Sequence, residues 1–365
     1  MHEKNENYEV YYLPYKGNLK DQLLVKSGKN RWVFLRKILS FSELVLQNFF
    51  VRAIPYSNLY YFSKKLIKTE NFQLIISSGK PYILFKICKI LNRKFKIPWI
   101  ADYRDPWSTH PWFVNRGILS VLDRHFEKKW VGSASAITTC SQLWSKEIGS
   151  FVKRPAYAVY NGYEEFEEMN ITTENDFFTI LYNGSLYDDQ RIELFAGAFK
   201  EFLNDGKTKK VKLYFHGLSI DPTQRERISG LFGTVKEYYE ITERIEKSAL
   251  VPMMKQAQLL LLIGHRNIKG WYPIKVFDYL SVQQPILLCP SDDDVLEKII
   301  TETRSGYVLN DKESIVRLLN EMYDKWEKGQ PSKLDIEQSK ILYYSRENQA
   351  KRLAEIVDEI LENKV

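Results

Sequence analysis

The second half of the chain alternates between short apolar runs and amphipathic segments. Apolar runs bounded by turn residues predict buried strands at FFTILYNGS, VKLYFHG, VKEYYEI, LLLLIG and PILLC, which span 177–185, 211–217, 235–241, 259–264 and 285–289. Segments between them have apolar residues every three or four positions and predict helices, among them PIKVFDYLSV with Pro273 in its first turn. LLLLIG has no polar alternation, as expected when both faces of a sheet are covered. Strands that alternate with helices predict βαβ units and a parallel sheet.

The first half carries a similar pattern. Strands are expected at 8–14, 72–79, 96–105, 135–141 and 155–163, with helices between them. The acidic segment after Asn161-Gly162 is interpreted as a linker, and YYSRENQAKRLAEIVDEILEN at the end as a long amphipathic helix. The chain is therefore predicted to be α/β, with Rossmann-like doubly wound domains at 1–163 and 164–341. Such domains bind ligands at the carboxyl ends of their strands, and the cleft between them is the expected active site.

The charge is unevenly distributed along the 365 residues. Residues 1–160 hold 26 Lys and Arg against 11 Asp and Glu, whereas the remaining 205 residues hold 27 against 35. This asymmetry predicts two domains with different partners, the first facing an anionic membrane surface, a phosphorylated acceptor or nucleic acid. The absence of a nucleic-acid-binding motif disfavours the last of these.

Other classes are excluded by composition. A hydrophobic share of 44% excludes disorder as the main state. The cysteines (Cys88, Cys140, Cys289) and the five histidines are scattered, which predicts neither a disulfide scaffold nor a local zinc motif. No apolar run reaches the length of a membrane span, and MHEKNENYEV is too polar for a signal peptide, so a cytoplasmic location is expected.

Four segments have the order and spacing of a known family. They are IISSGKPY (75–82), PWIADYRDPWS (98–108), the Asn-Gly pairs in VYNGYEEF and LYNGSLYDDQR, and QAQLLLLIG with YPIKVFDYLSVQQPILL (256–288). The sequence resembles the GT-B glycosyltransferases, specifically the family-four-like retaining transferases of bacterial surface-polysaccharide synthesis, over nearly its whole length. The resemblance implies a GT-B fold whose C-terminal helix, 342–365, crosses back and packs on the N-terminal domain. It also implies transfer of a sugar from a nucleoside-diphosphate sugar to a glycan or lipid-linked acceptor, with no metal and no other cofactor.

Gly184-Ser185 and Arg191 are candidates for donor binding. The glycine lies between a strand and a helix, where backbone can approach a phosphate and free N–H groups favour an anion. Arg191 is expected about one turn into that helix and offers a fork of donors to a diphosphate. The family has a phosphate-binding arginine in this region and usually adds a lysine, which Ile192-Glu193-Leu194 lacks. The alternative is an ordinary strand–helix turn with a surface arginine.

Lys275 and Asp278 are three residues apart and share one face of a predicted helix. Lys275 could neutralise phosphate near the helix N-terminus, and Asp278 could accept hydrogen bonds from ribose hydroxyls. The resemblance aligns Asp278-Tyr279-Leu280 with the family's ribose-binding Glu-Tyr-Leu-like segment. The alternative is a solvated ion pair between the two side chains. His216 ends a strand on the donor side and is either close to the nucleotide or an ordinary loop histidine.

Catalytic candidates follow the strand that ends in ADYRDPW. Asp102 or Asp105 could orient an acceptor hydroxyl, Arg104 could stabilise charge on the leaving phosphate, and His110 is a further candidate. The family has acceptor-contacting or catalytic polar groups on this loop. The alternative is a structural Asp–Arg pair that caps the loop.

Asp292-Asp293-Asp294 contains the Asp-x-Asp signature of metal-dependent transferases. It immediately precedes a predicted helix, and acidic residues at a helix start explain it more simply. Neither GxGxxG nor GxxxxGK[ST] occurs, which disfavours a dinucleotide dehydrogenase and a P-loop NTPase, and no Gly-x-Ser-x-Gly hydrolase elbow occurs.

Residues 31–68 are basic and rich in Phe, Tyr and Leu, with Glu43 as their single acid. Such a segment can lie on an anionic bilayer, which would suit a lipid-linked acceptor. The alternative is a set of core-packing helices with a basic outer face.

Family members usually begin with a strand, a glycine-rich loop and a helix before the segment that YEVYYLPYKG resembles. Here that segment starts at residue 8, so the first βα unit is expected to be missing. This keeps two rival functions open: a non-catalytic nucleotide-sugar or glycan-binding pseudo-enzyme, and a GT-B-type nucleotide-sugar epimerase.

Overall fold

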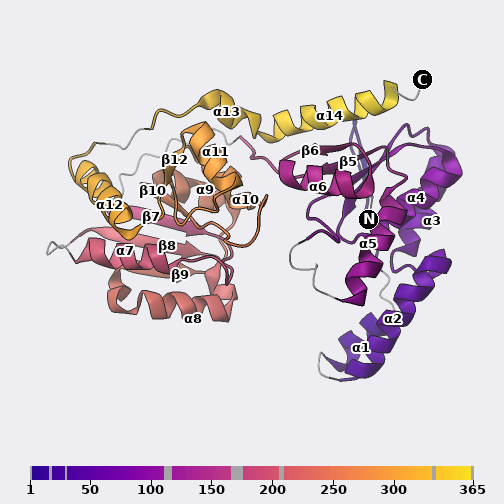
Figure 1. Ribbon diagram of the computed structural model, residues 1–365, viewed down its shortest axis with the longest axis horizontal. Coiled ribbons are helices and arrows are strands. Elements are labelled where there is room, and N and C mark those ends of the chain that lie inside the picture. The colour runs from indigo at the N-terminus through magenta and orange to yellow at the C-terminus, as the bar shows by residue number, and fades with distance from the viewer. Residues whose placement is uncertain are drawn as a thin grey trace. The chain divides into compact units, whose positions relative to one another are not determined.

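The computed structural model describes residues 2–15, 19–28, 31–110, 117–165, 176–204, 209–330 and 334–362 (Figure 1). Four side chains within its helices are also outside the description: Ser27, Leu44, Asn48 and Ile118. Most of the expected linker, 166–175, lies outside the described residues. The chain divides into two compact units, with Met1–Thr139, Ser145–Tyr157 and Val357–Val365 in unit 1 and Cys140–Trp144 and Ala158–Ile356 in unit 2.

Unit 2 is built on a parallel sheet with strand order β12-β11-β10-β7-β8-β9. Its strands are β7 (Phe178–Asn183), β8 (Val211–His216), β9 (Tyr239–Thr242), β10 (Leu259–Leu262), β11 (Ile286–Leu288) and β12 (Gly306–Val308). Its helices are α7 (Glu193–Leu203), α8 (Pro222–Leu231), α9 (Lys247–Gln256), α10 (Ile274–Val282), α11 (Val295–Thr303), α12 (Lys312–Glu327), α13 (Gln338–Tyr343) and the first part of α14 (Arg346–Glu362), with 3₁₀ turns η2 (Leu218–Ile220) and η3 (Gly233–Tyr238). The predicted parallel sheet is confirmed.

Both faces of this sheet are buried, because successive side chains of a strand point to opposite faces. In β7, Ile180 belongs to one apolar core and Leu181 to the other. Helices α7 and α12 cover the first face, and α9, α10 and α11 cover the second. The unbroken apolar run LLLLIG reflects this double burial, since its four leucines alternate between the two cores.

The order of the strands reverses at β7. The chain runs outward from β7 to β9 on one side, then returns to β10 and runs to β12 on the other. Ligands of open parallel sheets bind at the carboxyl ends of the strands at such a switch point. The turn that follows β7, beginning at Gly184, is therefore where unit 2 is expected to bind a ligand.

Unit 1 contains a second sheet, with described strand order β3-β4-β5-β6. The strands are β3 (Ile75–Gly79), β4 (Trp99–Tyr103), β5 (Ala136–Thr139) and β6 (Ala156–Ala158), and β4 pairs in parallel with β3 and β5. The helices are α1 (Leu19–Ser27), α2 (Val33–Phe49), α3 (Ser57–Thr69), α4 (Ile83–Phe95), α5 (Ile118–Val131) and α6 (Gln142–Val152), with η1 (Val51–Ala53). Within the described residues, no helix is both long and apolar enough to cross a membrane.

Three expectations differ from the structure. The strand expected at 8–14 is only β2 (Glu9–Tyr11), and it pairs antiparallel with β1 (His2–Lys4) outside the parallel sheet. The strand expected at 235–241 begins at Tyr239, because its first residues form η3 around the buried Val235. The last helix, expected from Tyr343, starts at Arg346 as α14, just after α13 ends. Between the two helices, Tyr163 pairs with the chain through the Tyr344 carbonyl oxygen and the Arg346 N–H. From Val357 onward α14 belongs to unit 1.

Candidate functional site

Two glycine turns meet at the carboxyl ends of β7 and β8. Gly184 has φ of 90° and Gly217 has φ of 89°, in the left-handed region that glycine adopts without strain. The Gly184 N–H donates to the His216 carbonyl oxygen at 2.8 Å, and a Cβ on Gly217 would lie 3.5 Å from the Gly184 Cα. At the switch point of unit 2, neither glycine adds a side chain of its own, so a phosphate can approach the backbone closely.

Lys275 points from the first turn of α10 toward this turn. Its Nζ donates to the Ser185 carbonyl oxygen at 3.1 Å and lies 3.8 Å from the centre of the Tyr182 ring. Burial lowers the pKa of Lys275 to about 7. Among the described residues, no carboxylate lies within ion-pair distance of its Nζ. Lys275 is therefore a partly desolvated cation, and an anion beside Gly184 would stabilise its charged form.

Asp278 lies one turn further along α10 and has a different partner. Lys247, at the start of α9, places its Nζ 3.1 Å from Asp278 Oδ1 and 3.7 Å from Glu164 Oε2. The solvated pair between Lys275 and Asp278, considered as the alternative, is not formed. Since Asp278 is only partly buried, a ligand hydroxyl could share this carboxylate with Lys247.

Arg191 is not within a helix. It lies on the loop that follows Ser185, two residues before α7 begins, and its side chain is exposed. The helix starts later than expected because residues 186–192 form a loop, in which Gln190 makes an isolated antiparallel bridge with His265. Arg191 is therefore on the same loop as Gly184, and the prediction that it lies within the helix is wrong.

Two residues that sequence analysis missed organise this loop. His265 follows β10, and its Nδ1 lies 3.0 Å from both carboxylate oxygens of Asp189 while its ring stacks on Trp271 at 4.8 Å. Arg227, from α8, donates to the Gln190 carbonyl oxygen at 2.8 Å. His265 could have been found as a polar residue just past a buried strand, but no local signal marks Arg227.

His216 is 1% exposed at the end of β8. Its Nδ1 lies 2.7 Å from the Thr242 hydroxyl, and its Nε2 has no hydrogen-bond partner among the described residues. Burial lowers the pKa of His216 to about 4, so the imidazole is neutral at neutral pH. A neutral, buried ring beside the two glycine turns can take part in hydrogen bonding but carries no charge for a phosphate.

In unit 1, Asp102 is the centre of a closed polar network at the end of β4. Its Oδ2 accepts from Ser78 Oγ at 2.6 Å and lies 3.2 Å from Arg104 Nε, and its Oδ1 accepts from Thr138 Oγ1 at 2.9 Å. Ser78 comes from β3, Thr138 from β5 and Arg104 from the loop after β4. The arrangement is the structural Asp–Arg pair considered as the alternative, and it engages both carboxylate oxygens.

Asp105 and His110 lie on the loop beyond β4. Lys80 places its Nζ 3.1 Å from Asp105 Oδ2, and this carboxylate remains partly exposed. His110 is 2% exposed, and burial is the main cause that lowers its pKa, opposed by the charge of Asp105. Among the four catalytic candidates, the Asp105 carboxylate and the neutral His110 imidazole are therefore close enough to interact electrostatically.

The acidic triplet caps a helix, as predicted. Asp292 accepts from the backbone N–H groups of Asp294, Leu296 and Glu297 at 2.9–3.2 Å, and Asp294 accepts from the Gly270 N–H at 2.5 Å. Within the described part of the chain, no group of three or more His, Cys, Asp or Glu side chains is arranged to hold a metal ion.

Comparisons with known proteins identify the fold. No protein-family model matches the sequence, and no curated protein sequence matches it. A glycosyltransferase from Rickettsia africae ESF-5 has a TM-score of 0.61 and 12% identity, over 85% of this chain and 83% of that chain. Sucrose-phosphate synthase from Thermosynechococcus elongatus has a TM-score of 0.60 and 13% identity, over 86% and 79%.

A third solved structure contains a nucleotide. HepE from Anabaena, in complex with UDP, has a TM-score of 0.59 and 10% identity, over 81% of each chain. At these identities the likeness shows the fold alone. With its two parallel sheets and flanking helices, the chain has the two-domain, Rossmann-like GT-B fold.

Proposed function

We propose that the protein is a glycosyltransferase that moves a sugar from a nucleoside-diphosphate sugar to a glycan or lipid-linked acceptor in cell-surface polysaccharide synthesis. The observation that carries this proposal is Lys275, a cation with a lowered pKa held against the glycine turn at the switch point of unit 2. The solved relatives support the substrate class, since HepE was captured with UDP and the O-GlcNAc transferase GtfA with UDP and GlcNAc.

The donor diphosphate would lie against the backbone of Gly184 and Ser185. Lys275 then contributes one positive charge, because the bound diphosphate restores the protonated state of the lysine that burial disfavours. Arg191 adds a second cation from the same loop. Asp278 accepts hydrogen bonds from the ribose hydroxyls while it stays paired with Lys247. His216 supports the turn through its carbonyl oxygen.

In the transfer step, the bond between the anomeric carbon and the diphosphate oxygen breaks and a bond from the acceptor hydroxyl oxygen to that carbon forms. We expect the anomeric configuration to be retained, with the acceptor proton passing to the departing phosphate oxygen. Lys275 and Arg191 stabilise the negative charge that develops on the diphosphate, and electrostatic stabilisation of this kind usually contributes most to the rate enhancement. These cations supply the charge that a metal would otherwise provide, so the reaction is proposed to be metal-independent.

The acceptor is assigned to unit 1. Asp105 and His110 are the candidates to orient the acceptor hydroxyl, and Asp102 positions Arg104 rather than reacting itself. The excess of basic residues in the first half favours an anionic environment, so we include peripheral contact with the cytoplasmic face of an anionic membrane in the proposal.

A transfer assay tests the proposal. The wild-type protein is incubated with labelled UDP- and GDP-sugars and a bacterial lipid extract, with and without EDTA, and label in the lipid or glycan fraction is followed. Asp278→Ala should lower transfer about 10–100-fold through lost ribose binding, because hydrogen bonds to a charged group contribute about 1.5–3 kcal/mol. Asp324→Ala, which removes an exposed carboxylate from α12, is the matched control and should transfer normally.

The outcomes separate the rival functions. Nucleotide binding without transfer to any acceptor would support a binding-only protein, and a changed sugar on the nucleotide would support an epimerase. Loss of transfer on addition of EDTA would contradict the metal-independent mechanism.

A further inference from the structure

Helix α2 in unit 1 exposes an apolar face, whereas the polar stripe opposite to it is half-buried or buried. Apolar residues on one face are 41–77% exposed, and we call them the α2 ridge: Phe34, Ile38, Phe41, Val45 and Phe49. Their spacing of three or four residues places them along a single stripe. The opposite stripe is polar yet more buried, with Arg36, Ser40 and Glu43 half-buried and Gln47 9% exposed. An amphipathic helix of a folded protein normally has the reverse arrangement.

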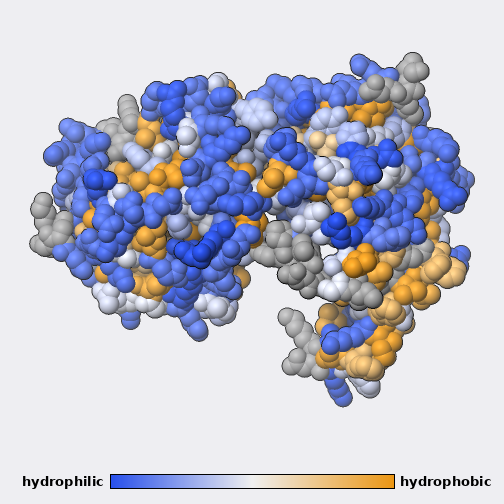
Figure 2. All heavy atoms as spheres, in the orientation of Figure 1, coloured by the Kyte–Doolittle hydropathy of each residue, from blue (hydrophilic) through white to orange (hydrophobic). Residues whose placement is uncertain are grey.

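The exposed apolar surface extends beyond the ridge. Trp32 and Phe50, at the two ends of α2, are 55% and 60% exposed, and hydrophobic residues gather over α1 and α2 in Figure 2. Contiguous apolar patches of this kind on a protein surface mark an interaction site. We therefore expect another molecule to cover this apolar surface.

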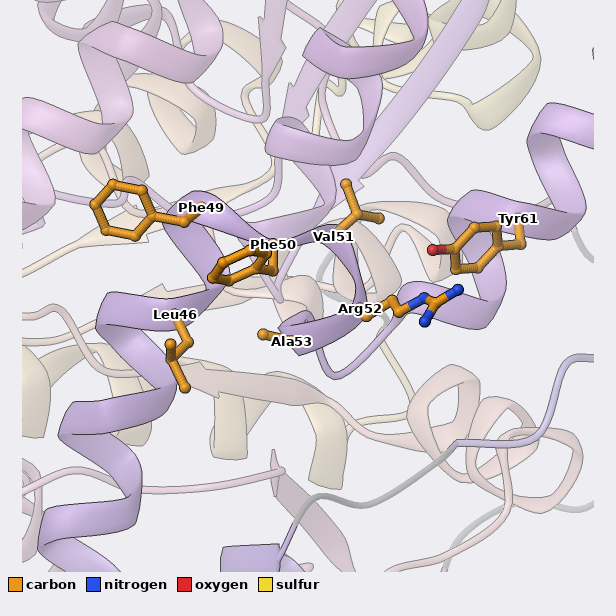
Figure 3. Close-up of a pocket in the computed structure, with 7 residues that line it drawn as sticks. All are labelled: Leu46, Phe49, Phe50, Val51, Arg52, Ala53 and Tyr61. Carbon is orange, nitrogen blue, oxygen red and sulfur yellow. The ribbon is translucent and has the colours of Figure 1, made fainter.

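A hollow of about 590 Å³ lies at the C-terminal end of the ridge. Leu46, Phe49 and Phe50 lie on one side of it, and Arg52 and Tyr61 on the other (Figure 3). The hollow thus combines apolar walls with one guanidinium and one phenol. A ligand that has a hydrocarbon portion and a nearby anionic group would match the apolar walls and the guanidinium.

Cations outnumber acids in α1 to α4, the helices of unit 1 that contain and flank the ridge along the chain. Lys37 and Arg52 are exposed, and neither α3 nor α4 contains an acidic residue. The charge of Lys64 lowers the pKa of Lys94, so cations face cations on these helices. The one acid of α2, Glu43, lies 4.0 Å from Lys20 of α1. A second copy of the chain on this face would bring like charges together, whereas an anionic surface would neutralise them.

We propose that the α2 ridge inserts into the headgroup region of an anionic lipid bilayer, with Lys37 and Arg52 beside lipid phosphates. This assignment rests on the membrane contact in the proposed function and identifies the residues that make it, but it does not depend on the transfer reaction. A helix that lies in the interface with its apolar face inserted and cations at its border binds through buried apolar area together with attraction to anionic lipid.

Co-sedimentation with vesicles tests the assignment. The probes are vesicles of phosphatidylcholine alone and of phosphatidylcholine mixed with phosphatidylglycerol. Wild type should bind the anionic vesicles at least about tenfold more tightly than the neutral ones, and less tightly as salt rises. The double variant Phe34→Ser/Phe49→Ser should lose about tenfold or more of this affinity. Ile220→Ser, which removes an equally exposed apolar residue from unit 2, should bind like wild type.

Two results would overturn the assignment. One is equal vesicle affinity of wild type and the double variant. The other is a wild-type dimer in sedimentation velocity that the double variant converts to monomer, with no vesicle binding by either, which would assign the ridge to a second copy. A thermal melt with nucleotide, run on each variant, checks folding and separates this question from the donor site. Failure of nucleotide binding in wild type would leave the vesicle result standing.

Discussion

Two charged side chains, one in each unit, lie near the carboxyl ends of parallel strands and differ in how their charge is balanced. In unit 1, Asp102 has Ser78, Thr138 and Arg104 as partners, all supplied by the fold. In unit 2, Lys275 has a carbonyl oxygen and an aromatic face but no carboxylate among the described residues, and its pKa is lowered. Removing one partner of a paired charge destabilises the fold, whereas a partly desolvated charge without a counter-charge is a candidate ligand site.

The largest effect predicted from this comparison is on catalysis. Lys275→Met keeps the length of the side chain and removes its charge, so turnover should fall about 100–1000-fold, as when a charge-stabilising donor is removed from an active site. Steady-state kinetics with the preferred donor measure it. Lys325→Met, on the exposed face of α12, is the control. Turnover within about threefold of wild type would show that Lys275 does not stabilise the transition state, because a threefold change in rate corresponds to less than about 1.4 kcal/mol.

Asp102→Ala should act on stability instead. It leaves the buried Thr138 hydroxyl and the exposed Ser78 hydroxyl without their acceptor and the exposed Arg104 without its counter-charge, which should cost about 1–3 kcal/mol in the free energy of unfolding. Asp102→Asn, which keeps one acceptor oxygen, should cost about half as much. Urea denaturation measures both. Nucleotide affinity should stay within about twofold, since the donor residues belong to unit 2; a stable Asp102→Ala variant with no transfer would instead make Asp102 catalytic.

The smallest effect is a pH dependence of donor binding. In the free protein Lys275 has a pKa of about 7, and a bound diphosphate raises it, so binding takes up a proton above pH 7. Affinity for a UDP-sugar should therefore be constant below about pH 6 and fall by at most tenfold per unit above pH 7. Calorimetric titration at several pH values measures this fall. Lys275→Met should show a flat profile, and the same decline in that variant would assign the proton to another group.

Much of the fold was predictable because buried parallel strands have a local signature. The run LLLLIG, covered on both faces, could be recognised without knowing its neighbours. The strand expected at 235–241 was partly wrong because a single buried residue, Val235, gives the same short apolar signal in a 3₁₀ turn.

The site was harder to predict because its pairings are distant in sequence. Ser185 and Lys275 could be named from their positions after a strand end and at a helix start, but their approach across 90 residues could not. The Asp189–His265 and Lys247–Asp278 pairs depend in the same way on the sheet order. The composition of residues 31–68 allowed either a membrane-facing segment or core-packing helices, because it carries no information on which face of a helix the protein covers. In α2 the apolar face is the exposed one.

The central claim is that unit 2 binds a nucleoside diphosphate through Lys275. It is tested most directly by a thermal-shift titration of wild type and Lys275→Met with UDP, GDP and their sugar derivatives. A ligand at 100 times its Kd should stabilise the wild type by about 2.7 kcal/mol. The account predicts such a shift with one nucleotide family and its near-complete loss in Lys275→Met. No shift with any nucleotide, or equal shifts in both proteins, would contradict it.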